Sequence, residues 1–418
     1  QPHAAPAPGA CSGEEETRGR GLFGIKKVSV GQDRAMERML VCFSSGGNCR
    51  LGSVRGLAKT RSVETMAKAV GGTFSRIQFT PDLLPSDITG TRIYRASSET
   101  FDVELGPVFA NFLLADEINR APAKVQSALL EVMGEHQVSL GGKTHILPDP
   151  FLVLATQNPI ESEGVYPLPE AQRDRFMMKV LMGYPSPAEE VAIVDRMGKV
   201  PPKATQVISP TDVLGLQAAA RERYIDRSVV EYAVNLVLAT RAPENFGLGD
   251  LRALIEYGAS PRASLALVKA GRSLALLRGR AYVLPQDVFD VAPEILRHRL
   301  VLTYEALAQD IDTEAVVTRI LSTVPAPRVT PSQSNGAAAA YHGAVTDAVV
   351  AACAQQHYDL LERLAQVVAD AALSEGRSDG EAGARVDEVT VSVRKLRPPV
   401  PHDLAFAGVR ITRRGAVG

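Results

Sequence analysis

The chain has 418 residues, more than one ordinary domain needs, and 45% of them are hydrophobic, as in soluble globular proteins. Its 46 basic and 47 acidic residues leave a formal net charge of −1, so no overall field favours nucleic acid or an anionic membrane. No apolar run reaches the about 18 residues of a membrane span, and the N-terminus lacks the apolar core of a secretory signal. The 4 cysteines have no paired spacing, which favours a reducing compartment, and we expect a cytoplasmic protein.

Composition predicts five consecutive segments. Residues 1–22, rich in Pro, Ala, Gly and charge, are expected to be a disordered leader. Apolar strand-like runs alternate with helical patterns over residues 24–184, which is typical of an α/β domain with a parallel sheet. Residues 185–324 have helical patterns throughout and predict a separate helical domain. A linker rich in Pro, Ser and Ala covers 325–340, and residues 341–414 are expected to form two helices and two strands.

Periodicity assigns faces to two of these elements. In the helical region, one side of the helix around residues 227–241 carries Val230, Ala233, Val234, Val237 and Leu238. Near the C-terminus, strict alternation places Val389, Val391 and Val393 on one face of a strand.

A candidate phosphate-binding loop begins at Gly52 and ends at Lys59 and Thr60, with Gly56, Leu57 and Ala58 between them. Such a loop needs glycines that turn backbone N–H groups inward, a lysine for the phosphates and a Ser or Thr for Mg²⁺. A helix is expected next, and its N-terminus favours anions. Its apolar face and its stop are Val63, Met66, Ala67 and Val70, followed by Gly71 and Gly72. A plain strand–turn–helix is the alternative for this stretch.

Polar residues also follow two predicted strands. Val108–Ala115 is expected to be a buried strand that ends in Asp116 and Glu117. In phosphate-loop ATPases such an Asp holds the Mg²⁺ shell and such a Glu polarises the attacking water. A helix cap is the alternative. The strand Phe151–Ala155 leads to Asn158, whose amide would orient the water or, alternatively, form a turn before a proline.

Four stretches closely resemble the MoxR branch of the AAA+ ATPases: residues 79–91 (FTPDLLPSDITGT), 106–133, 154–176 and 258–267. The resemblance covers about residues 24–328. It implies a nucleotide-binding α/β domain with an α-helical lid, assembled as a ring that is usually a hexamer. Such proteins bind ATP with Mg²⁺ and are thought to act as chaperone-like motors on a protein client, often with von Willebrand A-domain partners.

The resemblance also implies a role for individual residues. Lys59 and Thr60 match the Walker A motif, Asp116 and Glu117 the Walker B motif, Asn158 sensor 1, Arg175 the arginine finger and Arg262 sensor 2, while Gly31 and Gln32 match positions near the adenine. A cation at either arginine would stabilise charge on a transferring phosphoryl group. A surface salt bridge is the alternative for each arginine. Residues 79–105 are expected to be a long loop and, by the resemblance, an insertion that faces the pore and contacts substrate.

The phosphate loop departs from the family pattern. Ser53 replaces a glycine whose backbone conformation a Cβ is expected to strain, and Arg55 replaces a proline that stiffens the loop. Arg50 interrupts a strand that should be apolar on both faces. An ATP-binding or nucleotide-free scaffold with impaired hydrolysis is therefore the alternative function. No basic excess supports a motor that acts on nucleic acid.

Residues 341–413 resemble the C-terminal part of dihydroneopterin aldolase, an enzyme of folate biosynthesis, most specifically in VRKLRPPVP. The resemblance matches Glu362 to the carboxylate that anchors the pterin and Lys395 to the catalytic lysine. A solvated helix residue and an ordinary strand charge are the alternatives. The family's tyrosine position holds His342, and its N-terminal strand pair is absent. We expect a fusion remnant that is not an aldolase by itself.

Overall fold

The computed structural model describes most of the first 327 residues and short pieces closer to the C-terminus. The described residues are 33–53, 59–97, 99–157, 165–184, 186, 187, 189–191, 194, 206–327, 366, 370, 388–395 and 407–414. The chain divides into two compact units, residues 1–327 and 328–418.

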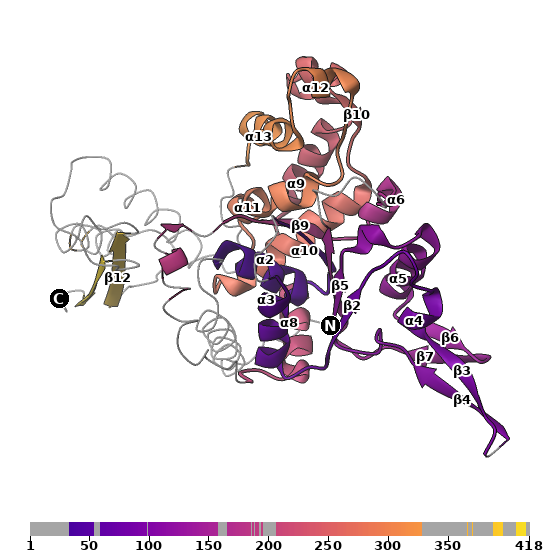
Figure 1. Ribbon diagram of the computed structural model, residues 1–418. Helices are drawn as coiled ribbons and strands as arrows, with labels where there is room; N and C mark the ends of the chain where they lie inside the picture. The colour runs from indigo at the N-terminus through magenta and orange to yellow at the C-terminus, as the bar shows by residue number, and fades with distance from the viewer. Residues whose placement is uncertain are drawn as a thin grey trace, which may run out of the picture. The chain divides into compact units, whose positions relative to one another are not determined.

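A five-stranded parallel sheet lies at the centre of the first unit, in the order β2-β5-β8-β1-β9 (Figure 1). Its strands are β1 (Cys49–Ser53), β2 (Phe74–Gln78), β5 (Phe112–Asp116), β8 (Leu152–Gln157) and β9 (Met178–Met182). Because all five strands run in the same direction, their carboxyl ends form one edge of the sheet and their amino ends form the other. The predicted parallel α/β fold is confirmed.

Helices cover both faces of this sheet. They are α2 (Asp33–Ser44), α3 (Lys59–Val70), α4 (Pro85–Thr89), the 3₁₀ helix η1 (Ile118–Arg120), α5 (Ala123–Glu135) and the short α6 (Glu170–Arg173). On one face, Phe112 of β5 meets Phe43 of α2, with ring centroids 5.1 Å apart. On the other face, Leu113 belongs to a buried cluster with Leu129 of α5. The central strand is thus buried from both sides, as parallel sheets require.

Helix α3 has the predicted face and end. Its apolar residues Val63, Met66, Ala67 and Val70 are all fully buried. Gly71 follows with a φ of +65°, a left-handed conformation that glycine adopts without the steric cost of a Cβ. The strand expected from Val108 is shorter than predicted, because β5 begins only at Phe112. Buried residues in a turn precede it, and burial alone does not distinguish such residues from a strand.

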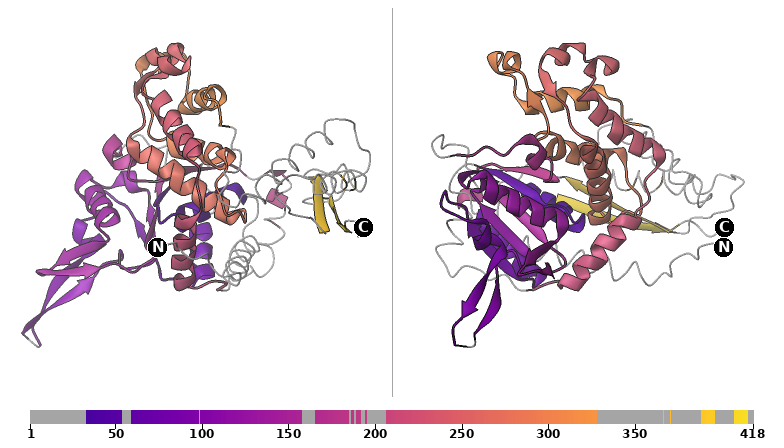
Figure 2. Two further views of the ribbon diagram at one scale, coloured as in Figure 1. Left: turned by 180° about the vertical axis from the view of Figure 1, so that it is seen from behind. Right: turned by 90° about the vertical axis from the view of Figure 1, so that its right-hand side faces the viewer.

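The described part of the sheet domain forms two antiparallel hairpins, and the first replaces most of the loop expected over residues 79–105. The first joins β3 (Gly90–Arg95) to β4 (Thr100–Leu105) and follows α4, so the prediction of an irregular loop is wrong. The second, which the sequence analysis missed, joins β6 (Gln137–Leu140) to β7 (Lys143–Ile146). Both hairpins protrude from the sheet domain on the side away from the lid (Figures 1 and 2).

The lid is largely helical. Its elements are α8 (Pro210–Glu222), α9 (Arg227–Ala239), the 3₁₀ helices η2 (Pro243–Phe246) and η3 (Gly249–Ala253), β10 (Ile255–Tyr257), α10 (Pro261–Leu277), α11 (Pro285–Leu296), β11 (Val301–Leu302), α12 (Tyr304–Ala308) and α13 (Thr313–Thr323). The antiparallel pair of β10 and β11 corrects the expectation of helices throughout. Side-chain oxygens cap five of the helices, at Ser209, Asp226, Ser260, Thr303 and Asp312. These caps satisfy backbone N–H groups that the first helical turn leaves without partners.

The buried face of α9 differs in part from the prediction. Ala233 and Val237 are buried as expected, whereas Val234 and Leu238 are exposed. Val229, Tyr232 and Leu236 complete the buried side instead. The apolar pattern of this helix is continuous enough to fit two adjacent faces, and packing selects the one that includes Tyr232.

In the second unit, the described strands are β12 (Glu388–Lys395) and β13 (Ala407–Arg414), which pair antiparallel along their whole length. The strand predicted around Val391 is confirmed. The two helices predicted for this unit lie outside the described residues, apart from isolated positions. Among all described residues, no helix combines the length and the apolar character needed to cross a membrane.

Candidate functional site

The carboxyl ends of the neighbouring strands β5 and β8 lie side by side, at Asp116 and Thr156. Thr156 of β8 donates a hydrogen bond from Oγ1 to Asp116 Oδ1 at 2.5 Å, and the Glu117 N–H donates to the same Oγ1 at 2.9 Å. On the other side of β8, Gly52 of β1 lies opposite Gln157. The strand ends that carry the predicted Walker B carboxylates and the start of the phosphate loop therefore lie at one edge of the sheet.

A cation from β2 orients the Asp116 carboxylate. Arg76 donates from Nη2 to Asp116 Oδ2 at 2.7 Å, while the Asp116 side chain is only 16% exposed. The same nitrogen of Arg76 also donates to Gln78 Oε1 at 3.0 Å. With one carboxylate oxygen on a hydroxyl and the other on a guanidinium, the Asp116 side chain has a fixed geometry.

Glu117 adopts a left-handed backbone with a φ of 57° at the start of η1. Residues other than glycine rarely adopt this conformation, and it is found most often at functional sites. The Glu117 carboxylate pairs with Arg120 Nε at 2.9 Å and accepts a hydrogen bond from Gln78 Nε2 at 3.0 Å. The carboxylate is partly exposed and is held beside Asp116 by side chains from two elements.

The predicted phosphate loop joins β1 to α3, but residues 54–58 lie outside the described residues, and so do Gly56, Leu57 and Ala58. Lys59 and Thr60 are the first residues of α3. Ser53 continues β1 and pairs with Met182, so its backbone is extended and tolerates a Cβ without strain. The strain expected at Ser53 is therefore not found.

Several other predicted residues lie outside the description. They are Gly31, Gln32, Arg55, Asn158 and Glu362. Lys395 is the last residue of β12 and lies opposite Ala407 in the second unit.

The residues at the carboxyl edge fit a magnesium nucleotide. Mg²⁺ prefers oxygen ligands, and Asp116 supplies a carboxylate that is already oriented by Thr156 and Arg76. Strand β1 ends at this edge and α3 follows it in the chain, and helix N-termini favour phosphate. Asp116 and Thr60 would hold the metal, and Lys59 would bind the phosphates.

Arg175 lies at the opposite edge of the sheet. It precedes Met178, the first residue of β9, and β9 runs parallel to β1. Because a five-residue strand spans about 15 Å, the side chain starts roughly that far from the carboxyl edge. Arg175 donates from Nη1 to the Leu130 carbonyl of α5 at 2.5 Å. A Cβ on Gly134 would lie 3.1 Å from the same nitrogen, so this helical glycine leaves space for the guanidinium.

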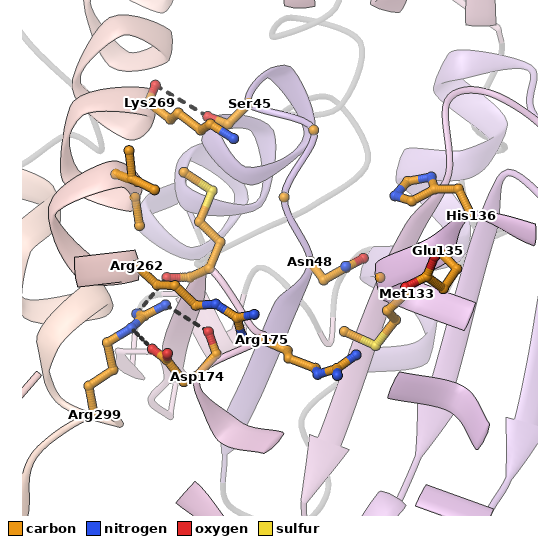
Figure 3. A pocket seen from close by; sticks show the side chains of 16 residues that line it. Ser45, Asn48, Met133, Glu135, His136, Asp174, Arg175, Arg262, Lys269 and Arg299 are labelled. Carbon is orange, nitrogen blue, oxygen red and sulfur yellow. Dashed lines mark hydrogen bonds and ion pairs between the residues drawn. The ribbon is translucent and has the colours of Figure 1, made fainter. Parts of the chain in front are cut away.

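Arg262, in the first turn of α10, lines the same cavity as Arg175 (Figure 3). The cavity has a volume of about 400 Å³. Its charged walls comprise four cations and two carboxylates: Arg175, Arg262, Lys269 and Arg299, with Glu135 and Asp174. Both Arg175 and Arg262 are exposed, and Figure 3 shows their guanidinium groups extending into the cavity. An excess of positive charge at a concave surface favours an anionic ligand.

The structure thus brings Arg175 together with Arg262, and Asp116 together with Glu117. Within one chain, these two pairs lie at opposite edges of the sheet. Geometry alone therefore excludes Arg175 as a group that acts on a nucleotide held by its own Asp116, unless the sheet is rearranged.

Arg50 is buried in the middle of β1. Its side chain is 4% exposed, and its Nε has no hydrogen-bond partner. Burial, and then the nearby charge of Arg173, lowers the pKa of Arg50 to about 10. Lys179 lies opposite Arg50 on β9, and burial together with Arg50 lowers the pKa of Lys179 to about 8. A buried cation among other cations opposes folding of the strand that leads into the phosphate loop.

Sequence reasoning missed Arg76, Gln78 and Thr156 at the carboxyl edge. Arg76 and Gln78 stand two residues apart at the end of β2, and this spacing places both on one face of a strand. The sequence shows that polar residues alternate in this short strand. Their contact with Asp116 could not be predicted from it, because the contact depends on β2 being the neighbour of β5.

Family models match three parts of the chain. The ATPase family associated with various cellular activities (AAA) matches residues 48–178, an AAA lid domain matches 251–320, and dihydroneopterin aldolase matches 329–412. The last match extends over the second compact unit, where it agrees with the resemblance found in the sequence.

Related proteins match over most of the first unit. The chain is 59% identical over 336 residues to a protein named chaperone MoxR1 of Mycobacterium tuberculosis, covering 80% of this chain and 89% of the relative. It is 30% identical to protein MoxR of Methylorubrum extorquens, covering 72% and 93%. A crystal structure from Cytophaga hutchinsonii, described as that of an inferred ATPase, is 45% identical with a TM-score of 0.72 and covers 77% of this chain and 100% of that one.

Proposed function

The chain belongs to the MoxR family of AAA+ ATPases, and on this basis we propose that it binds ATP with Mg²⁺ and hydrolyses it to drive chaperone-like remodelling or maturation of a protein client. The observation that supports this most strongly is the division of the predicted catalytic groups between two edges of the sheet. Carboxylates lie at one edge and exposed cations at the other. A site divided in this way is completed by a second copy of the chain.

At the carboxyl edge, Lys59 would bind the phosphates, and Thr60 and Asp116 would hold the metal. Bound ATP supplies the phosphoryl group, and Mg²⁺ neutralises its charge. Glu117 would polarise the attacking water, because its carboxylate is partly exposed beside Asp116 and a carboxylate accepts a proton from water in such sites. Asn158 would orient this water. Arg120 and Gln78 bind the Glu117 carboxylate and limit its movement.

At the amino edge, Arg175 and Arg262 would reach the phosphates of a neighbouring subunit. A cation that enters from a neighbour stabilises the transition-state charge of phosphoryl transfer. Head-to-tail contacts of this kind close into a ring. We propose a homo-oligomeric ring, and a hexamer is the expected size for this family.

The two protruding hairpins are the candidate client-binding surface. Tyr94 and Phe101 are more than half exposed and contact each other in a tilted arrangement with ring centroids 5.1 Å apart, while the Arg92 guanidinium lies 4.3 Å from the centre of the Phe101 ring. Exposed aromatic side chains supported by their own strand pairing are typical of protein-binding surfaces. A partner with a von Willebrand A domain is one candidate for contact with this chain.

A scaffold with impaired hydrolysis is the second candidate, and Arg50 favours it. The Arg50 guanidinium is buried and its Nε has no hydrogen-bond partner, which weakens β1, and β1 positions the phosphate loop. In that case the chain would act through its hairpins and lid while turning over little ATP.

For the second unit, we propose that residues 328–418 alone do not bind pterins. Equilibrium binding at millimolar ligand tests this proposal.

Steady-state ATP hydrolysis, titrated in protein concentration beside the variant Glu117→Gln, tests the leading proposal. A ring enzyme gives a specific activity that rises with protein concentration, because each site needs a neighbour. Glu117→Gln should abolish this activity and retain nucleotide binding. A wild-type rate equal to that of Glu117→Gln would reject the motor and leave the scaffold.

A further inference from the structure

Asp174 contacts both segments that carry the cations of the amino-edge cavity. It directly precedes Arg175, and its Oδ2 accepts a hydrogen bond from Ser260 Oγ at 2.7 Å. Ser260 is the N-cap of α10 and accepts a hydrogen bond from the Arg262 N–H at 3.1 Å. One carboxylate therefore links the segment of Arg175 in the sheet domain to the first turn of the lid helix that carries Arg262.

Arg299 fixes the other side of this segment. It donates from Nε to Asp174 Oδ1 at 2.7 Å, from Nη2 to the Phe176 carbonyl at 2.8 Å and from Nη1 to the Met177 carbonyl at 3.0 Å. Its side chain is 3% exposed. Arg175 is thus flanked by a carboxylate on one side and two carbonyls on the other, and all three accept hydrogen bonds from one buried guanidinium. Figure 3 shows the contact between Arg299 and Asp174.

We propose that Asp174 is a positioning residue for ATP hydrolysis: with Arg299 and Ser260 it forms a clamp that holds Arg175 and Arg262 in one geometry, so that both reach a neighbour's phosphates together. The inference rests on the proposed function, since the clamp serves cations that act between subunits. The charge of Asp174 also offsets the mutual repulsion of the guanidinium groups around it. Because the clamp joins the lid to the sheet domain, a movement of the lid shifts Arg175 as well.

The substitution Asp174→Asn tests the clamp, because it keeps the shape of the side chain and removes its charge. We expect kcat to fall about tenfold or more, since a small displacement of a catalytic group has effects of this size. The KM for ATP should change little, because cations of this kind act mainly on charge that develops in the transition state. In the background of Arg175→Ala, the substitution should cause a smaller further loss than in wild type, because only the part that acts through Arg262 remains.

Asp287→Asn is the matched control for a purely structural role. Asp287 is fully buried in the lid and accepts hydrogen bonds from Arg278 at 3.0 Å and from Arg280 at 2.6 Å. It does not line the cavity, so its loss should lower thermal stability and leave kcat of the folded protein unchanged. An unchanged kcat in Asp174→Asn would overturn the clamp, and so would a loss that adds fully to that of Arg175→Ala.

Ser260→Ala keeps the test decisive if Asp174→Asn fails to fold, because Ser260 is only partly buried and the Arg299–Asp174 pair remains. Removal of the hydrogen bond from Ser260 to Asp174 should lower kcat about fivefold. In the background of Arg262→Ala, the same substitution should leave kcat unchanged. An equal effect of Ser260→Ala with and without Arg262 would overturn the clamp. A wild-type rate no higher than that of Glu117→Gln would instead reject the proposed function and the clamp with it.

Discussion

The two edges of the parallel sheet differ in whether their charged side chains are paired within the chain. At the carboxyl edge, Asp116 and Glu117 are each paired with a cation of the same chain, at 2.7 and 2.9 Å. At the amino edge, Arg175 and Arg262 extend into a cavity, and within the described part of the chain no carboxylate forms an ion pair with either. Among the described residues, the two carboxylates of the first edge are paired within the chain, whereas the two exposed arginines of the second edge are not.

This difference shows which half of the candidate site depends on a partner. Paired carboxylates keep their geometry in an isolated subunit, because Arg76 and Thr156 hold Asp116 whether or not a neighbour is present. Exposed cations that are fixed by their backbone segments, as Arg175 is by Asp174 and Arg299, are ready for an anion from outside.

Removal of Arg175 should have the largest effect. Arg175→Ala should lower kcat by about 10³-fold or more, the usual contribution of an arginine finger. Nucleotide affinity should stay the same, because Arg175 is about 15 Å from the carboxyl edge. Steady-state hydrolysis and equilibrium nucleotide binding check the two statements, and Arg227→Ala, at an exposed surface pair with Glu231, is the control. A large loss of nucleotide affinity would mean that Arg175 serves its own subunit.

Removal of Arg262 should have a smaller effect of the same kind. Arg262→Ala should lower kcat about 10²-fold, the size seen when one donor to developing charge is lost. Because Arg262 shares the cavity with Arg175, the double variant should lose less than the product of the two single losses. Hydrolysis rates of the single and double variants measure this coupling. Independent effects would mean that the two cations act at different nucleotides.

Replacement of Arg50 should stabilise the strand between the two edges. Arg50→Leu should raise the free energy of unfolding by about 1–3 kcal/mol, because it removes a buried cation whose Nε has no hydrogen-bond partner. Thermal and denaturant unfolding measure the gain. The pKa of Arg50 is lowered to about 10 in the folded chain, so its penalty is complete below that pH and is relieved as pH rises above it. If Arg50→Leu is less stable than wild type near neutral pH, Arg50 has an anionic partner.

The smallest effect concerns Lys179. Its folded pKa of about 8 lies below the usual 10.5, so the unfolded chain binds more protons between these values. The free energy of unfolding should therefore rise as pH increases from about 8 towards 10.5. Lys179→Met should remove most of this rise, which denaturant unfolding at several pH values measures. A slope that persists in Lys179→Met would assign the effect to other groups.

The sequence predicted the elements whose signal is local. The phosphate-loop helix carries a complete apolar face with a glycine stop, and Asp116 and Glu117 follow a buried strand, so both were found without knowledge of the fold. The lid arginine at 262 was identified only by resemblance, because a single exposed arginine in a helix has no distinctive local pattern.

The remaining features depend on contacts between distant parts of the chain. Asp174 meets Ser260 across 86 positions and Arg299 across 125, and no local pattern encodes such pairs. The first hairpin was mistaken for a loop because its strands are exposed on both faces and lack the alternation of a half-buried strand. Arg50 was recognised as out of place, but only the structure shows that Lys179 and Arg173 surround it.

The most direct test of a site divided between subunits is a mixing experiment. Arg175→Ala subunits keep the Asp116 and Glu117 carboxylates, and Glu117→Gln subunits keep the cations. Each variant alone should be inactive, and a mixture should recover ATP hydrolysis in proportion to the junctions at which an intact Glu117 faces an intact Arg175. A mixture that stays as inactive as its components, while wild type is active under the same conditions, would contradict this account.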